Sequence, residues 1–147
     1  MGVKGRVTVA DGALVLVDTN PIVYWLEGHP LGERFVDLFD QIDSGRVQAI
    51  VTPITLAEVL VGPLRAGNTT LATRYRRALT HGPGFSLREM DAEIAVLAAQ
   101  YRATMRLKLP DAIQLATAVH EGCVALVTHD RDFRVVRDIE ILGIDAR

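Results

Sequence analysis

Two short apolar runs set the strongest limit on how this chain can fold. Residues 14–17 read Leu-Val-Leu-Val and residues 124–127 read Val-Ala-Leu-Val. Apolar runs of this length are typical of buried strands, and the segments between them place apolar residues at helical intervals. The pattern predicts strands that alternate with helices. We therefore expect an α/β domain whose parallel sheet is covered by helices on both faces.

The other elements are predicted from the same periodicities and from the glycines, prolines and capping residues between them. Strands are expected at 14–18, 47–52, 85–87, 124–127 and 139–142. Helices are expected at 21–27, 31–44, 55–64 and 91–101, with one that opens at 67–70 and one from 110 to 122. Residues 14–147 are predicted to form a single three-layer α/β/α domain around a mainly parallel sheet of four to five strands. Residues 1–13 are predicted to be an N-terminal arm or a short extension.

The composition excludes several classes of protein. At 147 residues the chain has the size of one domain, and its apolar share of 49% includes few aromatics, as expected for an α/β sheet. No apolar stretch approaches the roughly 18 residues that a membrane span needs, and none of signal-peptide length precedes Asp11. The single Cys123 cannot form an internal disulfide. We therefore expect a cytoplasmic protein without a membrane segment.

Acidic residues stand where predicted strands end or predicted helices begin, at Asp18, Glu58, Asp111 and Asp130. Asp18 directly follows the first apolar run, and Asp130 follows the last one after two polar residues. Ligands of parallel α/β sheets bind beyond the carboxyl ends of the strands. Carboxylates gathered there repel one another unless cations or protons intervene. The pattern therefore indicates a metal site, and carboxylate oxygens suit Mg²⁺ or Mn²⁺.

Single members of this set also have simpler explanations. Thr55 followed by Glu58 has the spacing of a capping box, in which Glu58 would turn back onto the start of its own helix. Asp111 follows Pro110 and would meet the positive end of a helix whatever the function. Asp132 is favoured as a turn residue, with a supporting role at the site as the alternative. The group of acids, rather than any one of them, carries the prediction.

Four segments of the chain form a recognisable series. They read Val-Asp-Thr-Asn at 17–20, Thr-Leu-Ala-Glu-Val-Leu at 55–60, Leu-Pro-Asp-Ala-Ile-Gln-Leu-Ala-Thr-Ala at 109–118 and Val-Thr-His-Asp-Arg-Asp-Phe at 127–133. In this order they resemble the PIN domain, and in particular its VapC-type toxin ribonucleases. The resemblance implies a PIN-like fold and a Mg²⁺- or Mn²⁺-dependent endoribonuclease that hydrolyses RNA phosphodiester bonds. It also implies a small VapB-like antitoxin as partner, and a homodimer.

The resemblance further implies roles for particular residues. The metal ligands and catalytic residues would be Asp18, Glu58, Asp111 and Asp130. The residues that orient these carboxylates or their bound waters would be Thr19, Thr128 and Asp132. The chain departs from the family pattern at His129, where such sequences often have asparagine.

Local positive charge is present although the formal net charge is −2. Arg74, Arg76 and Arg77 lie in a stretch without acids, and we predict that they contact RNA phosphates. The alternative is a solvated helix face. Tyr24 and Trp25 are expected to pack in the domain or to face a partner.

Other function classes compete with the nuclease. A non-catalytic PIN-like module that binds RNA or protein would share the fold, but the presence of all four acids weighs against it. A phosphoacceptor receiver domain would need a lysine after a later strand, and the only lysines are Lys4 and Lys108. A Rossmann-type dinucleotide-binding domain is excluded because no G-x-G-x-x-G follows the first strand.

Overall fold

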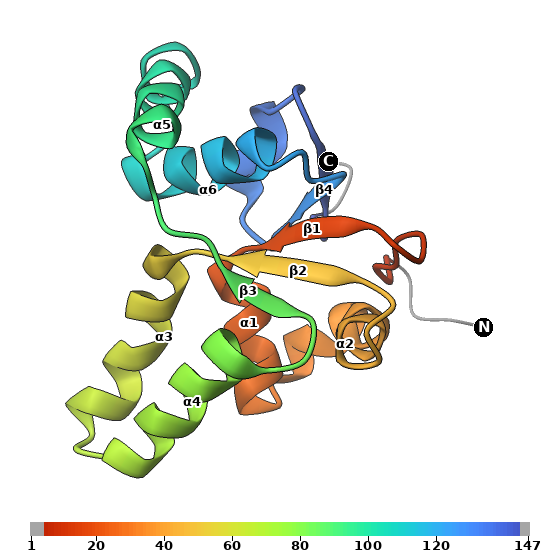
Figure 1. The fold of residues 1–147 in the computed structure, drawn as a ribbon, viewed down its shortest axis with the longest axis vertical. Helices are drawn as coiled ribbons and strands as arrows, with labels where there is room; N and C mark the ends of the chain where they lie inside the picture. Colours follow the sequence, from red (N-terminus) through yellow and green to blue (C-terminus); the bar gives the residue numbers. More distant parts are fainter. Residues whose placement is uncertain (1–4, 145–147) are drawn as a thin grey trace.

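A parallel sheet of five strands forms the centre of the computed structural model, which describes residues 5–144. The strands are β1 Leu14–Val17, β2 Gln48–Val51, β3 Phe85–Leu87, β4 Ala125–Val127 and β5 Glu140–Leu142. Their order in the sheet is β3-β2-β1-β4-β5, and every neighbouring pair is parallel (Figure 1). The predicted mainly parallel sheet is therefore confirmed.

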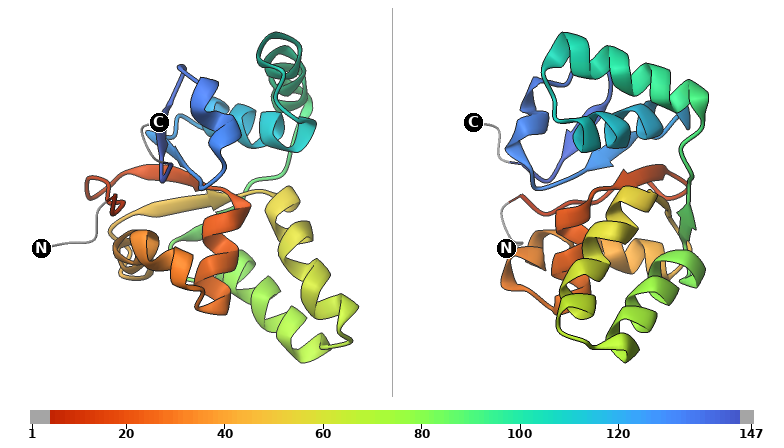
Figure 2. Two further views of the ribbon diagram at one scale, coloured as in Figure 1. Left: turned by 180° about the vertical axis from the view of Figure 1, so that it is seen from behind. Right: turned by 90° about the vertical axis from the view of Figure 1, so that its left-hand side faces the viewer.

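Helices cover both faces of this sheet (Figures 1 and 2). One face carries α1 Thr19–Glu27, α2 Val36–Asp43, α3 Pro53–Arg65 and α4 Thr69–His81. The other carries α5 Ala92–Met105 and α6 Leu109–His120, and two 3₁₀ segments, η1 Pro30–Phe35 and η2 Arg131–Val135, complete the layers. None of the helices within residues 5–144 has the length and hydrophobicity needed to cross a bilayer. The three-layer α/β/α architecture is confirmed.

The apolar runs of the strands supply two separate cores. Because successive side chains of a strand point to opposite faces, Val15 and Val17 pack with Ile22 of α1, whereas Leu16 packs with Ile94 of α5 on the other face. All five of these side chains are fully buried. Burial on both faces explains why the central strands are apolar at every position rather than at alternate ones.

The strand order creates a switch point at the carboxyl ends of β1 and β4. From β1 the chain moves to β2 on one side, and it later returns to β4 on the other side of β1. Loops that leave such neighbours in opposite directions open a crevice between them. Asp18 follows β1 directly, and the segment after β4 holds Thr128 and Asp130. The fold thereby brings together segments about 110 residues apart.

Three predicted helix starts are wrong, and the first is that of α1, which begins at Thr19 and not at residue 21. The helix with Glu58 begins at Pro53, not at Thr55, because Thr52 is its N-cap and proline suits the first helical position. The predicted helix 31–44 is a 3₁₀ segment followed by α2.

Gly32 of that segment packs so closely on Tyr24 that an added Cβ would lie 2.9 Å from the Tyr24 Cβ.

Residues 5–13 form no helix or strand but lie against the domain. The Val7 side chain is 4% exposed, and the Val7 N–H donates to the Arg34 carbonyl at 2.8 Å. The Gln41 side chain donates to the Val9 carbonyl at 2.7 Å. The division into an arm 1–13 and a domain 14–147 stays a prediction, and residues 1–4 of the arm lie outside the described part of the chain.

Candidate active site

A pocket of about 300 Å³ lies at the switch point, and all four predicted acids line it. Its acidic lining residues are Asp18, Glu58, Asp111 and Asp130. They come from the end of β1, from α3, from the first turn of α6 and from the segment after β4. Thr19, Asn20, Val23 and Tyr24 of α1 line the same pocket. We call it the acidic pocket.

Asp18 is the most buried of these acids, with 5% of its surface exposed. Its Oδ1 accepts a hydrogen bond from Gln114 Nε2 at 2.9 Å, and its Oδ2 accepts one from Thr128 Oγ1 at 2.8 Å. Burial raises the pKa of the Asp18 carboxyl, and the hydrogen bonds from Gln114 and Thr128 oppose that rise. Both oxygens are therefore held in place by donors from two different elements.

Gln114 connects Asp18 to the start of α3. Its Nε2 also donates to Thr55 Oγ1 at 2.9 Å, and its Oε1 accepts from Thr52 Oγ1. Gln114, Thr52 and Thr55 are each at most 1% exposed, so this network is dry. A buried polar network with every group bonded holds its members in one geometry. Gln114 thus fixes both the Asp18 carboxylate and the helix that carries Glu58.

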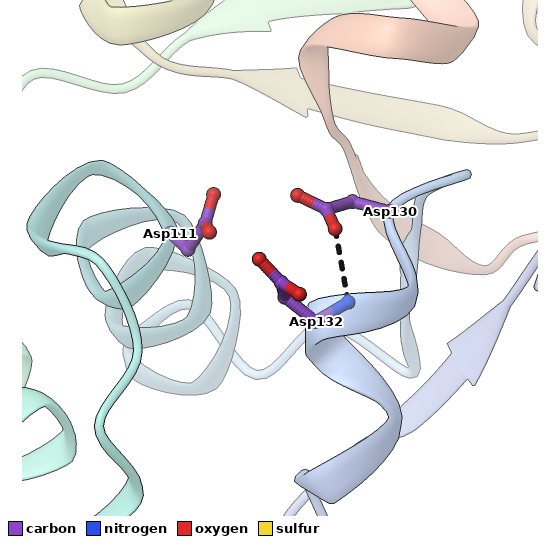
Figure 3. Close-up of side chains that lie close together, drawn as sticks. All are labelled: Asp111, Asp130 and Asp132. Carbon is purple, nitrogen blue, oxygen red and sulfur yellow. Dashed lines mark hydrogen bonds between the residues drawn. The ribbon is translucent and has the colours of Figure 1, made fainter.

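Two acids of the pocket, Asp111 and Asp130, lie close to a third carboxylate, Asp132, which does not line the pocket. Asp111, Asp130 and Asp132 each offer one oxygen, and these oxygens lie within 4.8 Å of one another (Figure 3). Asp130 Oδ1 also accepts the Asp132 N–H at 2.9 Å, which closes the first turn of η2. We call these residues the acidic trio. Asp132 is thus both a turn residue and a neighbour of the two predicted ligands.

Asp111 shows the electrostatic cost of this gathering. The pKa of its carboxyl is raised to about 7, mainly by burial and then by the charges of Asp130, Asp18 and Asp132, while Lys108 opposes the rise. A carboxylate among carboxylates takes up a proton unless another positive charge is supplied. Near neutral pH, the cation-free pocket therefore holds a proton on Asp111 for part of the time.

Glu58 lines the pocket but stands apart from the acidic trio. Its Oε1 accepts a hydrogen bond from Thr19 Oγ1 at 2.9 Å, and Thr19 Oγ1 lies 3.0 Å from Thr55 Oγ1. The predicted capping box is wrong, because Thr52 caps α3 and Thr55 is buried inside it. Glu58 therefore extends into the pocket region rather than back onto its own helix.

The hydroxyls of Thr19 and Thr128 contact the carboxylates of Glu58 and Asp18 respectively. These contacts are the kind that their predicted orienting role requires, and the role itself stays a prediction. Thr128 Oγ1 also accepts the Asp130 N–H at 3.0 Å. One threonine thereby links two of the acids.

Tyr24 and His129 form a pair at the edge of the acidic pocket that the sequence patterns did not reveal. The Tyr24 hydroxyl lies 2.9 Å from His129 Nδ1, and the two rings meet edge to face with centroids 5.5 Å apart. The ring of His129 also meets Phe35 edge to face.

Gln114 was missed as well, although a glutamine inside the apolar stretch 112–118 was a visible signal.

The predicted RNA-binding arginines do not join the acids. Arg74, Arg76 and Arg77 are exposed on α4 and do not line the acidic pocket. Helix α4 packs on α3 and β3, on the face of the sheet opposite α6 (Figure 1). Their contact with RNA stays a prediction, for a surface separate from the acidic pocket.

The donor set of the acidic pocket fits a divalent cation. Carboxylate oxygens are the preferred ligands of Mg²⁺ and Mn²⁺, and Mg²⁺ needs only a few of them because it keeps several waters. One oxygen from each carboxylate of the acidic trio lies within 4.8 Å of the others, so these three residues form a group that could hold a metal ion. A cation would also remove the repulsion that raises the pKa of Asp111.

The chain is similar to known proteins over most of its length. The PIN domain family matches residues 15–139. A curated relative, Ribonuclease VapC1 of Rickettsia felis, is 24% identical over 106 residues, which cover 68% of this chain and 79% of that protein. A solved toxin–antitoxin complex from Klebsiella pneumoniae contains a chain with 27% identity and a TM-score of 0.67, covering 90% of this chain and 96% of that one. The solved VapBC2 of Rickettsia felis, bound to a DNA fragment from its promoter, has 16% identity and a TM-score of 0.69, with 87% and 96% covered.

Proposed function

This chain belongs to the PIN domain family, and from that premise we propose that it is a metal-dependent endoribonuclease, the toxin of a toxin–antitoxin pair. The observation that carries the proposal is the gathering of Asp18, Glu58, Asp111 and Asp130 in one pocket at the switch point of the sheet. The relative named Ribonuclease VapC1 and the similar chain of a toxin–antitoxin complex support the same function.

The metal ion would be held by Asp18, Asp111 and Asp130, with Glu58 as a further ligand and Asp132 beside them. When bound, Mg²⁺ or Mn²⁺ supplies charge stabilisation and an activated water for hydrolysis of a phosphodiester bond. The chain's own residues fix the geometry. Gln114 and Thr128 hold the Asp18 carboxylate, and Thr19 holds that of Glu58.

The partner we propose is a VapB-like antitoxin that covers the acidic pocket and keeps the nuclease silent. Two similar solved structures are a toxin–antitoxin complex and the VapBC2 structure, and this chain covers 96% of the matching chain in each. We expect the protein to act in the cytoplasm, where RNA is present, and to form a homodimer as the family resemblance implies.

Cleavage of total RNA by the purified, antitoxin-free protein tests this function. We expect cutting with Mg²⁺ or Mn²⁺, no cutting with a chelator, and no cutting by Asp111→Asn with either metal. Asp43→Asn is the matched control, because Asp43 is an exposed acid at the end of α2, outside the acidic pocket. It should cut like the unmodified chain.

A folded protein that cuts no RNA under any of these conditions would count against the nuclease and favour the non-catalytic binding module. Cutting that survives in Asp111→Asn, or in the chelator, would separate the activity from the acidic pocket. Comparing Mg²⁺ with Mn²⁺ at equal concentration identifies the ion that supports the faster reaction.

A further inference from the structure

A second cavity, of about 240 Å³, lies beside the acidic trio and has three basic residues in its lining. Arg106 and Lys108 come from the connection between α5 and α6, and Arg134 comes from η2. Asp132 lines this cavity too, and it also belongs to the acidic trio. We call it the basic cavity. One side chain thus forms the boundary between the two sites.

The backbone around the basic cavity is held in place by its own contacts. Leu107 is 3% exposed and anchors the α5–α6 connection in the core, and its carbonyl accepts from Arg102 Nη1 at 2.6 Å. In η2, Arg134 Nη1 donates to the Arg131 carbonyl at 3.1 Å. The cationic groups are therefore presented from two anchored segments, although their side chains are exposed.

The basic cavity has three cations and one acid, Asp132, in its lining. Within residues 5–144, neither Arg106 nor Lys108 nor Arg134 makes an ion pair with a carboxylate. Asp132 is the acid that lines the cavity, and its carboxylate faces Asp111 and Asp130 (Figure 3). A cation among these acids would offset the charge of Asp132. The basic cavity would then present three positive charges beside the site of cutting.

We propose that the basic cavity binds a backbone phosphate of the RNA strand that neighbours the phosphate being cut. This proposal rests on the nuclease function proposed above. An RNA strand carries a phosphate at every nucleotide, so a strand with one phosphate at the acidic trio must place another close by. Arginine and lysine are the side chains that bind phosphate most strongly, and such contacts position a strand without reading its sequence.

The location favours the basic cavity over the arginines of α4 for this role. The basic cavity shares Asp132 with the acidic trio, whereas Arg74, Arg76 and Arg77 lie across the sheet from α6. Lys108 is close enough to the acidic pocket to lower the pKa of Asp111 against the effect of burial. A phosphate held here would set the register of the strand at the acids, and α4 could contact only distant nucleotides.

Binding of a single-stranded RNA oligonucleotide, measured across a range of salt concentrations in Mg²⁺, tests the proposal. The variants are made in an Asp18→Asn background so that the oligonucleotide stays intact. Lys108→Gln with Arg134→Gln should weaken binding on the order of tenfold, and should reduce the slope of log K against log salt by about 0.7, the value for one phosphate contact on a single strand. Each single variant should show a smaller change in the same direction.

Arg46→Gln is the matched control for Lys108→Gln. Arg46 is an exposed cation just before β2, at the amino end of the sheet and away from both cavities. Removing its charge should leave the affinity and the salt slope unchanged. Arg106→Asn gives an independent check, because Arg106 has a φ of 59°, a backbone conformation that asparagine tolerates better. It removes one charge without straining the connection.

The proposal is overturned if the double variant keeps its melting temperature and shows the same RNA affinity and the same salt slope as the background. The basic cavity would then be a candidate site for an acidic segment of a protein partner. Equal losses in Arg46→Gln would also overturn the proposal, because the effect would then be general electrostatics. Failure of the nuclease is distinguishable from both results, since binding is measured without cleavage. In a chain that cuts RNA, the double variant should raise KM more than it lowers kcat.

Discussion

Asp18 shares one pocket with Asp111 and Asp130 of the acidic trio, but the protein holds Asp18 and the trio in opposite ways. Asp18 is buried, and donors from α6 and from the end of β4 hold both of its oxygens. The carboxylates of Asp111, Asp130 and Asp132 are more exposed and lie close to one another. The first is fixed by the fold alone. The three carboxylates of the acidic trio repel one another, so their geometry becomes favourable only when a cation binds between them. A site with one rigidly held ligand and an exchangeable cation is expected to have this arrangement.

The strongest test of the difference between Asp18 and the acidic trio is to remove the charge of Asp18 while keeping the shape of its side chain. Asp18→Asn should lower the rate of RNA cleavage roughly 1,000-fold, in the range for loss of a group that stabilises a transition state. The fold should survive, because an asparagine oxygen can still accept one of the two hydrogen bonds. Cleavage assays and circular dichroism on the same preparation check both expectations. A rate close to that of the unmodified chain would remove Asp18 from the catalytic set.

The next effect concerns the donors that hold Asp18. Gln114→Leu should reduce the free energy of unfolding by about 3 kcal/mol, because a buried carboxylate loses its partner along with two threonine hydroxyls. Urea unfolding measures the change.

The matched control for that variant is Gln41→Leu. Gln41 is also buried, at 7% exposed, but it bonds only neutral backbone groups of Val9 with its side chain. Gln41→Leu should lose less free energy of unfolding than Gln114→Leu. The Gln41→Leu variant should cleave RNA at the unchanged rate when it is assayed well below its melting temperature. Equal losses of stability and activity in the two variants would show that Gln114 is an ordinary core residue.

Cation binding should stabilise the folded protein, and this stabilisation should depend on the acidic trio as well as on Asp18. Mg²⁺ at about 100 times its dissociation constant should raise the free energy of unfolding by about 2.7 kcal/mol. In Asp111→Asn the gain should nearly vanish, whereas Asp43→Asn should keep it. Thermal melts with a chelator and with increasing Mg²⁺ measure the effect. An equal gain in Asp111→Asn would locate the cation elsewhere.

The last effect is a pH dependence of stability in the absence of divalent cations. The folded state raises the pKa of Asp111 from its usual 3.8 to about 7, so folding favours the protonated form. Stability should therefore rise as the pH falls from about 7 toward 4 and stay level above 7, as far as this group is concerned. Burial of Asp18 acts in the same direction.

Melting temperatures between pH 5 and pH 8 measure this slope. Asp111→Asn should flatten it, and Mg²⁺ should flatten it as well because a cation replaces the proton. A chain without cation that becomes steadily less stable from pH 8 to pH 5 would contradict the raised pKa values.

Much of this molecule could be predicted from local pattern. The strands at β1 and β4 follow from apolar runs that alternate with helical spacing, and the acids after them follow from the rule that ligands bind beyond strand ends. The start of α3 was misplaced because Thr52-Pro53 and Thr55-Glu58 are both good helix starts, and neighbouring residues alone do not rank them. The metal and catalytic roles of the four acids stay predictions.

The sequence by itself therefore determined the fold class and the set of acids in the acidic pocket, because strand length, helix period and capping are properties of adjacent residues. Only the tertiary structure decided that Gln114 holds Asp18, that Asp132 joins Asp111 and Asp130, and that the arginines of α4 lie away from them. These relations join residues on different elements. They depend on how α6 and η2 pack around the end of β4, and packing across a sheet leaves no periodic trace along the chain.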